Sequence, residues 1–150
     1  MNRAHDQAHM DEPPITHYLA YLLAQANRQV TAQLAEALND EGVQIEHWRI
    51  LEVLSDEQGR SMGELAELVL MNHPALTKTM DRMVSNGFVH RRADAQDSRR
   101  VLVYITDHGL ELVARLKECV DQHHQAINDA VGSKKAEQLK KLLGELIKST

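Results

Sequence analysis

The chain has 150 residues, of which 43% are hydrophobic and 3% aromatic, and its formal net charge is −5. This length predicts a single globular domain, and no apolar run approaches the roughly 18 residues that a membrane-spanning helix needs. The first 14 residues lack the apolar core of a signal peptide. We therefore expect a cytoplasmic protein with no membrane partner.

The N-terminal third of the chain predicts an arm and two helices. Residues 1–14 are polar, with two adjacent prolines and no periodicity, which is typical of a flexible arm. From residue 15 to about residue 40, apolar side chains recur every three or four positions, which predicts a long amphipathic helix that ends at Gly42. A second helix is predicted over 44–54. Its expected inward-facing residues are Ile45, Trp48, Leu51 and either Val53 or Leu54.

Two short helices and a hairpin follow. Ser61 and Glu64 have the spacing of a capping box, which predicts the start of a third helix. The stretch "HPALTKTMDRMVSNG" predicts a fourth helix, opened by a proline near its first position and closed by a C-terminal glycine. "FVHRR" and "RVLVYI" flank the polar segment "ADAQDS", a pattern that indicates a two-stranded hairpin.

Two long amphipathic helices complete the chain. Thr106 is placed to cap the first, which should end near Ala130, and Gly132 and Ser133 separate it from the second. The element order predicts a mainly α fold with a small β-wing, namely a winged helix-turn-helix over 43–105. The apolar stripes of 15–40 and 106–150 need a partner surface, so we expect these segments to form a helical dimerisation region in a homodimer.

Charge is unevenly distributed along the chain. Between His73 and Arg100 there are six cationic and three anionic side chains, a local +3, whereas the remaining 11 cations and 19 anions give −8. A basic patch on an acidic body is typical of a surface that attracts phosphate locally. A solvated charged hairpin is the alternative that charge by itself leaves open.

The segment "LTKTMDRMVSNGFVHRRADAQDSRRVLVYITDHG" resembles the signature of the multiple antibiotic resistance regulator (MarR) family. The shared features are a helix that ends in Asp-Arg-hydrophobic, a glycine, an aromatic-Val pair, a basic pair, a D-x-R-R wing and Thr-x-x-Gly at the next helix. The matching element order extends over residues 15–150. The resemblance implies a homodimeric transcriptional regulator, usually a repressor, that binds a pseudo-palindromic operator in double-stranded DNA and is released by a small ligand.

The expected DNA-binding residues lie on the fourth helix and the wing. Small or hydrogen-bonding side chains in the first turns of the helix permit close approach to major-groove edges, and the resemblance places the wing tip in the minor groove, where inserted arginine is favoured. The "NHP" start is unusual for the family and leaves the base preference open. The full set is Ser61, His73, Pro74, Ala75, Thr77, Lys78, Thr79, Arg82, Arg91, Arg92, Asp97, Ser98, Arg99 and Arg100.

Within this set we expect distinct roles. Ser61 would offer its hydroxyl and a helix N-terminus to a phosphate. Asp97 should orient Arg99, and strand alternation turns only one residue of the pair 91–92 towards DNA. Asp81 is repelled by phosphate and is expected to hold an arginine of the wing or a neighbouring loop. Arg82 has two readings of equal weight, a protein ion pair or a DNA contact.

A small aromatic or phenolic compound, or its thioester, is the effector class that the resemblance implies. Such ligands bind between the helical base and the DNA-binding head, where an arginine or histidine would meet a carboxylate and a tryptophan would stack. The candidate residues are His17, Tyr21, His47, Trp48 and Arg49. An ordinary core position for Trp48 and a salt bridge for Arg49 are equally favoured alternatives to these effector-binding roles.

Four other readings remain alternatives or are set aside. Zinc sensing by the nine histidines is a minority alternative, because the adjacent His123 and His124 cannot share one helical face and exposed or satisfied histidines are favoured. Cys119, the one cysteine, is expected to be a half-buried helix residue rather than a thiol switch. A winged helix used as a protein-interaction module is a second alternative. No catalytic motif is present, so we expect no enzyme, no cofactor and no metal.

Overall fold

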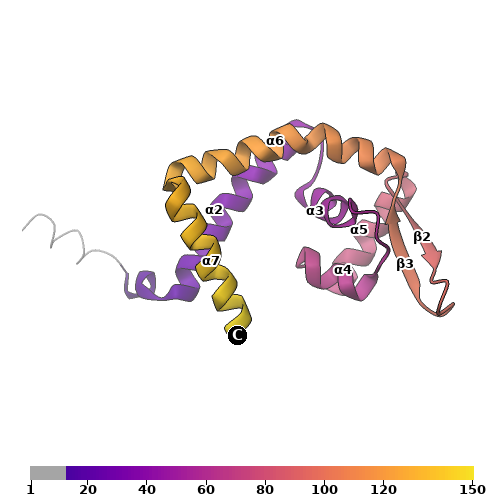
Figure 1. The fold of residues 1–150 in the computed structure, drawn as a ribbon, viewed down its shortest axis with the longest axis horizontal. Helices are drawn as coiled ribbons and strands as arrows, with labels where there is room; N and C mark the ends of the chain where they lie inside the picture. The colour runs from indigo at the N-terminus through magenta and orange to yellow at the C-terminus, as the bar shows by residue number, and fades with distance from the viewer. Residues whose placement is uncertain (1–12) are drawn as a thin grey trace, which may run out of the picture. The chain divides into compact units, whose positions relative to one another are not determined.

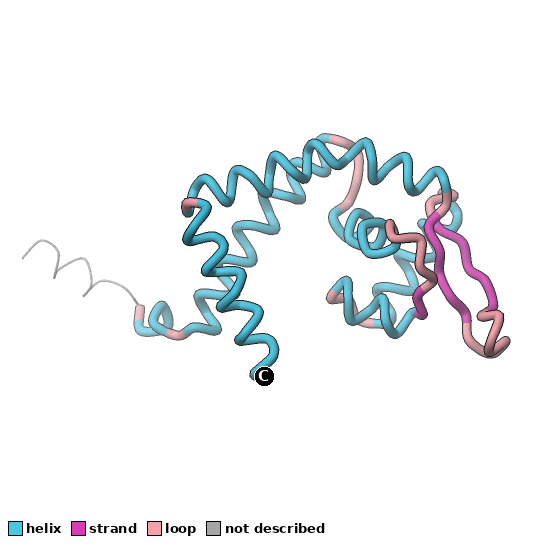
Figure 2. Tube along the Cα trace, in the orientation of Figure 1, coloured by secondary structure: helices cyan, strands magenta, loops and turns pink. Residues whose placement is uncertain are grey.

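The computed structural model describes residues 13–150 of the chain, so the predicted arm falls almost wholly outside the described residues. The chain divides into two compact units, Met1–Gln33 and Leu34–Thr150. The elements are η1 (Pro14–His17), α2 (Leu19–Asp40), α3 (Ile45–Leu54), β1 (Arg60–Ser61), α4 (Met62–Val69), α5 (His73–Ser85), β2 (Val89–Ala93), β3 (Val101–Ile105), α6 (Asp107–Val131) and α7 (Ser133–Ser149). Figure 1 labels these elements, except η1 and β1, and Figure 2 colours them by type. None of the described helices is long and apolar enough to cross a membrane.

The described part of the first unit corrects the predicted start of the first helix. Residues 14–17 form one turn of 3-10 helix after Pro13, and Tyr18 then takes an extended conformation with ψ 130°. The α-helix therefore begins at Leu19 rather than at residue 15. The interruption lies at Tyr18, whose extended backbone separates the single 3-10 turn from the α-helix that follows.

The second unit has one hydrophobic core, made where α3, α4, α5 and the hairpin meet the first half of α6 (Figure 1). Apolar residues at helical spacing supply it from each helix, and alternate residues supply it from the strands. The fully buried side chains are Leu38, Ile50, Leu51, Leu54, Leu65, Leu76, Met80, Met83, Leu116, Val69, Val89 and Val103. This core fixes the position of the hairpin relative to α5.

Helix α3 shows where helical periodicity misassigned a residue. Ile45, Leu51 and Leu54 are buried as predicted, and Trp48 is half-buried and packs against the core. Ile50, which was not predicted to face inward, is also fully buried. The reason is that α3 is packed on several sides, against α4, α5, α6 and β3, so its buried surface is wider than one stripe.

The predicted hairpin is confirmed and belongs to a three-stranded antiparallel sheet in the order β1-β3-β2. Its register pairs His90 with Tyr104 and Arg91 with Val103. Strand β1, which pairs Arg60 with Val103 on the other edge of β3, was not predicted. Two residues are too few to show the alternation from which strands are recognised.

The chain turns at the glycines where the sequence predicted that helices end. Gly42, Gly87 and Gly132 all have positive φ, at 76°, 75° and 95°, a backbone region that glycine adopts without a Cβ clash. Thr106 caps α6 by accepting a hydrogen bond from the Gly109 backbone N–H at 3.1 Å. The predicted fold class, mainly α with a small β-wing, is confirmed.

Candidate nucleic-acid interface

Helix α5 turns a polar face to solvent. Its side chains at Leu76, Met80 and Met83 enter the core, so the opposite face is exposed. The helix begins after Asn72, whose side-chain oxygen accepts a hydrogen bond from the Ala75 backbone N–H at 2.9 Å. We did not predict this cap, although asparagine just before a helical run is an ordinary N-cap signal. The exposed residues are His73, Pro74, Ala75, Thr77, Lys78, Asp81, Arg82 and Ser85.

The predicted contact residues of α5 are not equally available. Thr79 is half-buried, and the Thr77 hydroxyl donates to the His73 carbonyl oxygen at 3.0 Å. Lys78 and Arg82 are exposed, and neither forms an ion pair within residues 13–150. The pairing of Arg82 with an acid therefore has no support in this part of the chain, and the two residues give α5 an unneutralised positive charge.

An ion pair ties α5 to the wing. Arg91 of β2 donates from Nη2 to Asp81 Oδ1 at 2.6 Å, which confirms that Asp81 holds a wing arginine. Arg92 points to the opposite face of the sheet, where its guanidinium carbon lies 5.3 Å from the centre of the Tyr104 ring. The expected alternation of these two arginines is therefore present, with only Arg91 on the α5 side.

The wing tip is shaped by two aspartates. Asp94 Oδ1 accepts the Gln96 backbone N–H at 3.0 Å, and Asp97 Oδ1 accepts the Arg99 backbone N–H at 3.1 Å. Asp97 thus fixes the backbone at Arg99 rather than its guanidinium group. Among the described residues no acidic side chain pairs with Arg99, which is exposed together with Ser98 at the tip.

Glu64 connects α4 with the wing in a way that we did not predict. Its carboxylate forms an ion pair with the guanidinium of Arg100. The same carboxylate accepts from the Ser61 hydroxyl at 3.1 Å, while Ser61 Oγ accepts the Glu64 backbone N–H at 3.2 Å. The predicted capping box is therefore only half present, because Glu64 turns to Ser61 Oγ and Arg100 instead of the Ser61 backbone N–H. Both Ser61 and Arg100 already have partners within the protein.

The candidate effector residues do not share one cavity within the second unit. His47 lines a hollow of about 380 Å³ together with Leu51, whereas Trp48 and Glu52 line a separate hollow of about 70 Å³ against α6. Adjacent helical residues diverge by about 100°, which explains the separation. Burial lowers the pKa of His47, and the charge of Arg82 lowers it further against the opposing effect of Glu46. Arg49 is half-buried, and His17 and Tyr21 belong to the first unit.

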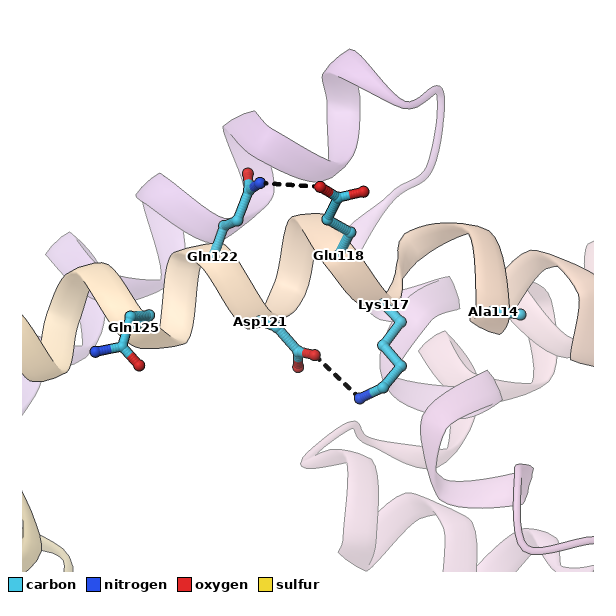
Figure 3. Close-up of a pocket in the computed structure, with 6 residues that line it drawn as sticks. All are labelled: Ala114, Lys117, Glu118, Asp121, Gln122 and Gln125. Carbon is cyan, nitrogen blue, oxygen red and sulfur yellow. Dashed lines mark hydrogen bonds and ion pairs between the residues drawn. The ribbon is translucent and has the colours of Figure 1, made fainter.

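A larger hollow of about 660 Å³ lies along α6, and Figure 3 shows its lining. All six residues come from α6 itself, and four of them pair along the helix: Lys117 with Asp121 at 3.0 Å, and Gln122 with Glu118 at 3.4 Å. Among residues 13–150, no second element contributes to its lining. This hollow therefore has the character of a solvated helix surface rather than of a binding pocket.

The remaining histidines and the cysteine differ in their surroundings. Within residues 13–150 no group of three or more His, Cys, Asp or Glu side chains is arranged to hold a metal ion. His124 Nε2 lies 3.4 Å from the Asn128 amide nitrogen, but His123 Nε2 is shielded from solvent and has no partner in the described chain. His123 thus departs from the expectation of exposed or satisfied histidines. Cys119 is half-buried, as predicted, and burial together with Glu41 and Asp40 raises its pKa, which disfavours the reactive thiolate.

Known proteins resemble this chain both in the winged helix-turn-helix and over most of its length. The family model described as MarR family matches residues 41–100, which cover α3, β1, α4, α5, β2 and the wing tip and end just before β3. The HTH-type transcriptional regulator FarR of Neisseria gonorrhoeae is 32% identical over 126 residues, which are 84% of this chain and 86% of FarR.

Two solved structures resemble the whole described fold. The MarR family transcriptional regulator SPO1453 from Silicibacter pomeroyi DSS-3 matches with a TM-score of 0.80 and 30% identity, covering 92% of this chain and 98% of that one. NadR in complex with 4-hydroxyphenylacetate matches with a TM-score of 0.75 and 30% identity, covering 86% of this chain and 92% of NadR. The similarity therefore includes the helices outside the winged helix-turn-helix as well as the head.

Proposed function

The chain belongs to the MarR family of transcriptional regulators, and we propose that it is a homodimeric repressor which a small aromatic or phenolic compound, or its thioester, releases from DNA. The observation that carries the proposal is the placement of unpaired cations. Lys78 on α5 and Arg99 at the wing tip are both exposed and form no ion pair within residues 13–150. Exposed cations on a helix and on an adjacent wing that have no acidic partner in this range are available to neutralise DNA phosphates.

We assign the two elements different parts of the operator. Helix α5 would enter the major groove, with the exposed His73, Ala75 and Lys78 nearest to the base edges. The wing would follow the backbone into the flanking minor groove, with Arg99 inserted. Because Ser61 and Arg100 are engaged with Glu64, their part in the proposal is to position the wing rather than to contact DNA first.

The dimer of this proposal is formed by segments 15–40 and 106–150. Its support is the apolar face of α7, where Leu139, Leu142 and Ile147 are 48%, 60% and 74% exposed in the single chain. A second copy of the same helices would remove this surface from water. Two heads held by such a base would meet successive major grooves on one side of a pseudo-palindromic operator.

The effector class of the proposal is supported by the similarity to NadR, whose structure contains 4-hydroxyphenylacetate. An effector acts on DNA binding only through different affinities for the DNA-bound and free conformations of the protein. We therefore propose that the ligand stabilises a conformation in which the two recognition helices do not fit successive major grooves. A zinc ion in place of an aromatic effector remains the alternative within the same fold.

The test is fluorescence anisotropy of the protein on DNA from upstream of its own gene, measured as a function of salt. Arg99→Ala should weaken binding about tenfold or more and reduce the slope of log affinity against log salt by about one, because one phosphate-neutralising cation is lost. Lys134→Ala, which removes an exposed cation at the start of α7, is the matched control and should change neither quantity.

Addition of 4-hydroxyphenylacetate, other phenolic acids and Zn²⁺ to the same complex then tests the response. Release by an aromatic acid supports the repressor proposal, whereas release by Zn²⁺ alone favours the zinc-sensing alternative. Absence of DNA binding at every salt concentration would favour the alternative that the chain is a protein-interaction module.

A further inference from the structure

The backbone at the start of α5 offers few free hydrogen-bond donors. Asn72 satisfies two of them, since its side-chain oxygen accepts the Ala75 N–H at 2.9 Å and its carbonyl oxygen accepts the Leu76 N–H at 3.0 Å. Pro74 has no backbone N–H to offer. The donors that a first helical turn leaves open for a ligand are therefore largely used within the helix itself.

The side chain of Thr77, one turn further along α5, is also turned to an internal partner. Its hydroxyl donates to the His73 carbonyl oxygen at 3.0 Å, so the hydroxyl proton is directed at the helix backbone. Thr77 is nevertheless an exposed residue. The part of its side chain that makes no hydrogen bond is the methyl group. Thr77 therefore offers a partner a methyl group rather than a hydroxyl donor.

The neighbours of Thr77 on the helix surface extend this apolar character. Residues three and four positions apart lie side by side on a helix, so Pro74 is next to Thr77, and Ala75 is next to Lys78 on the adjoining row. All four residues are exposed. Pro74, Ala75 and the Thr77 methyl group thus form a small apolar surface, and one cation borders it.

The charges beside this apolar surface favour its approach to DNA. Asp81 is the one acidic residue of α5, and Arg91 holds its carboxylate at 2.6 Å. Lys78 forms no ion pair within residues 13–150. On the opposite side of α5, Leu76 and Met80 are fully buried. Their burial fixes the rotation of the helix, so that Thr77 and Lys78 face outward together.

We infer that Thr77 is a specificity-determining residue, which recognises the 5-methyl group of a thymine in the major groove through its own methyl group. Thymine displays this methyl group in the major groove, where apolar side-chain atoms contact it. Pro74 and Ala75 cover the sides of the contact and exclude water from it, while Lys78 adds charge at its border. The inference rests on the proposed function, because it requires that α5 enters the major groove.

The competing role for Thr77 is a hydrogen bond between its hydroxyl and a base. As a donor, the hydroxyl would first have to give up its hydrogen bond to the His73 carbonyl oxygen. As an acceptor, it could receive a bond from a base amino group without that loss. The two roles differ under substitution. A contact made by the methyl group survives loss of the hydroxyl, and a contact made by the hydroxyl survives loss of the methyl group.

The experiment is a deoxyuridine scan of the operator. Footprinting of the full chain on DNA from upstream of its own gene first locates the bound segment. Each thymine of that segment is then replaced by deoxyuridine, which lacks only the 5-methyl group, and fluorescence anisotropy at one salt concentration measures the affinity for each duplex. Thymines in the flanks where the wings lie are internal controls, because their methyl groups project into the major groove and not into the minor groove.

We expect one thymine in each half-site to be sensitive. Its replacement should weaken binding about fourfold, which is the effect of taking one buried methyl group out of a contact. Replacement of the symmetry-related pair should weaken binding about fifteenfold, because two separate contacts add in free energy. Replacement of thymines in the wing flanks should leave the affinity unchanged.

Two substitutions at the same position identify the group that reads the thymine. Thr77→Val removes the hydroxyl but keeps the methyl group, so it should retain both the operator affinity and the preference for thymine over deoxyuridine. Thr77→Ser keeps the hydroxyl but removes the methyl group, so it should bind thymine and deoxyuridine duplexes equally. Thr77 is exposed, so both variants should fold, and thermal unfolding of each variant verifies this.

Three results would contradict the inference. Equal affinity for every deoxyuridine duplex would overturn it and leave the repressor proposal standing. A thymine preference that Thr77→Ser retains, or that Thr77→Val loses, would also overturn it, because the methyl group of Thr77 would then not be the reading group. Failure of the protein to bind any of the DNA would reject the repressor proposal, and the inference with it.

Discussion

The head of the protein, from α3 to β3, and the terminal helix α7 have similar apolar patterns but different fates. Leu76 and Leu65 in the head are completely buried, whereas Leu142 and Ile147 of α7 are 60% and 74% exposed, and Ala136 is the one buried residue of α7. An amphipathic stripe therefore predicts that a helix surface will be covered, but it does not predict whether the same chain or another chain covers it. The head covers most of its own apolar residues, whereas the outer apolar residues of α7 are exposed in the single chain.

The largest expected contrast is between Leu76→Ala in the head and Leu142→Ala in α7. Leu76→Ala should cost about 2–5 kcal/mol of unfolding free energy at every protein concentration, because it leaves a cavity in a closed core. Leu142→Ala should lower the unfolding free energy of the monomer by less. It should instead weaken the dimer, and so reduce the stability that the protein gains at higher protein concentration. Urea unfolding at two protein concentrations measures both. Equal, concentration-independent losses would contradict the proposed dimer role of α7.

Two glycines sharpen the same comparison. A Cβ at Gly109 would meet the Phe88 carbonyl oxygen and the Ile105 side chain, at 2.4 and 2.6 Å, so Gly109→Ala should cost about 1–3 kcal/mol through overpacking. At Gly144 of α7 a Cβ would have nothing within 4 Å in the described chain, so Gly144→Ala should stabilise by up to about 1 kcal/mol through helix propensity. Thermal unfolding distinguishes the two signs. Destabilisation by Gly144→Ala would indicate that a partner helix packs closely there.

The surface of the head should behave differently from its core. The ion pair of Asp81 and Arg91 is exposed, so Asp81→Asn should change the unfolding free energy by less than about 1 kcal/mol. It should weaken operator binding more than it weakens the fold, because the wing loses its link to α5. Asp121→Asn, which breaks the exposed pair with Lys117, is the matched control. Equal DNA affinity of the two variants would show that the link does not position the wing.

The smallest effect concerns His47, which is half-buried in the head. Burial lowers its folded-state pKa below the ordinary value of 6.5, so the unfolded chain binds the extra proton more readily. The contribution of His47 to the unfolding free energy is constant above about pH 6.5. The unfolding free energy falls as the pH drops from there through the lowered pKa of His47. His47→Gln should flatten this part of the pH profile, and His124→Gln controls for the loss of one imidazole. A profile that His47→Gln leaves unaltered would argue against burial of this ring.

Much of the candidate interface was predictable because it depends on local chemistry. Helix ends, turn glycines and the β-branched strands are set by neighbours in sequence, and the partnership of Asp81 with a wing arginine follows from charge. The Glu64–Arg100 pair joins residues 36 positions apart, so local spacing could not reveal it. The separation of His47 and Trp48 into different hollows was accessible from the 100° step of a helix, but their lining partners on α6 were not.

The sequence by itself determined the order and type of most elements, the polar face of α5 and the position of the arginine-rich wing. These features follow from periodicity, caps and charge, which act over a few residues. Tertiary structure alone decided that Ile50 is buried, that a two-residue strand completes the sheet, and that Arg115 and His47 meet around one hollow. The physical reason is that burial and pocket lining depend on which distant segments pack together, and the core of the second unit makes that choice.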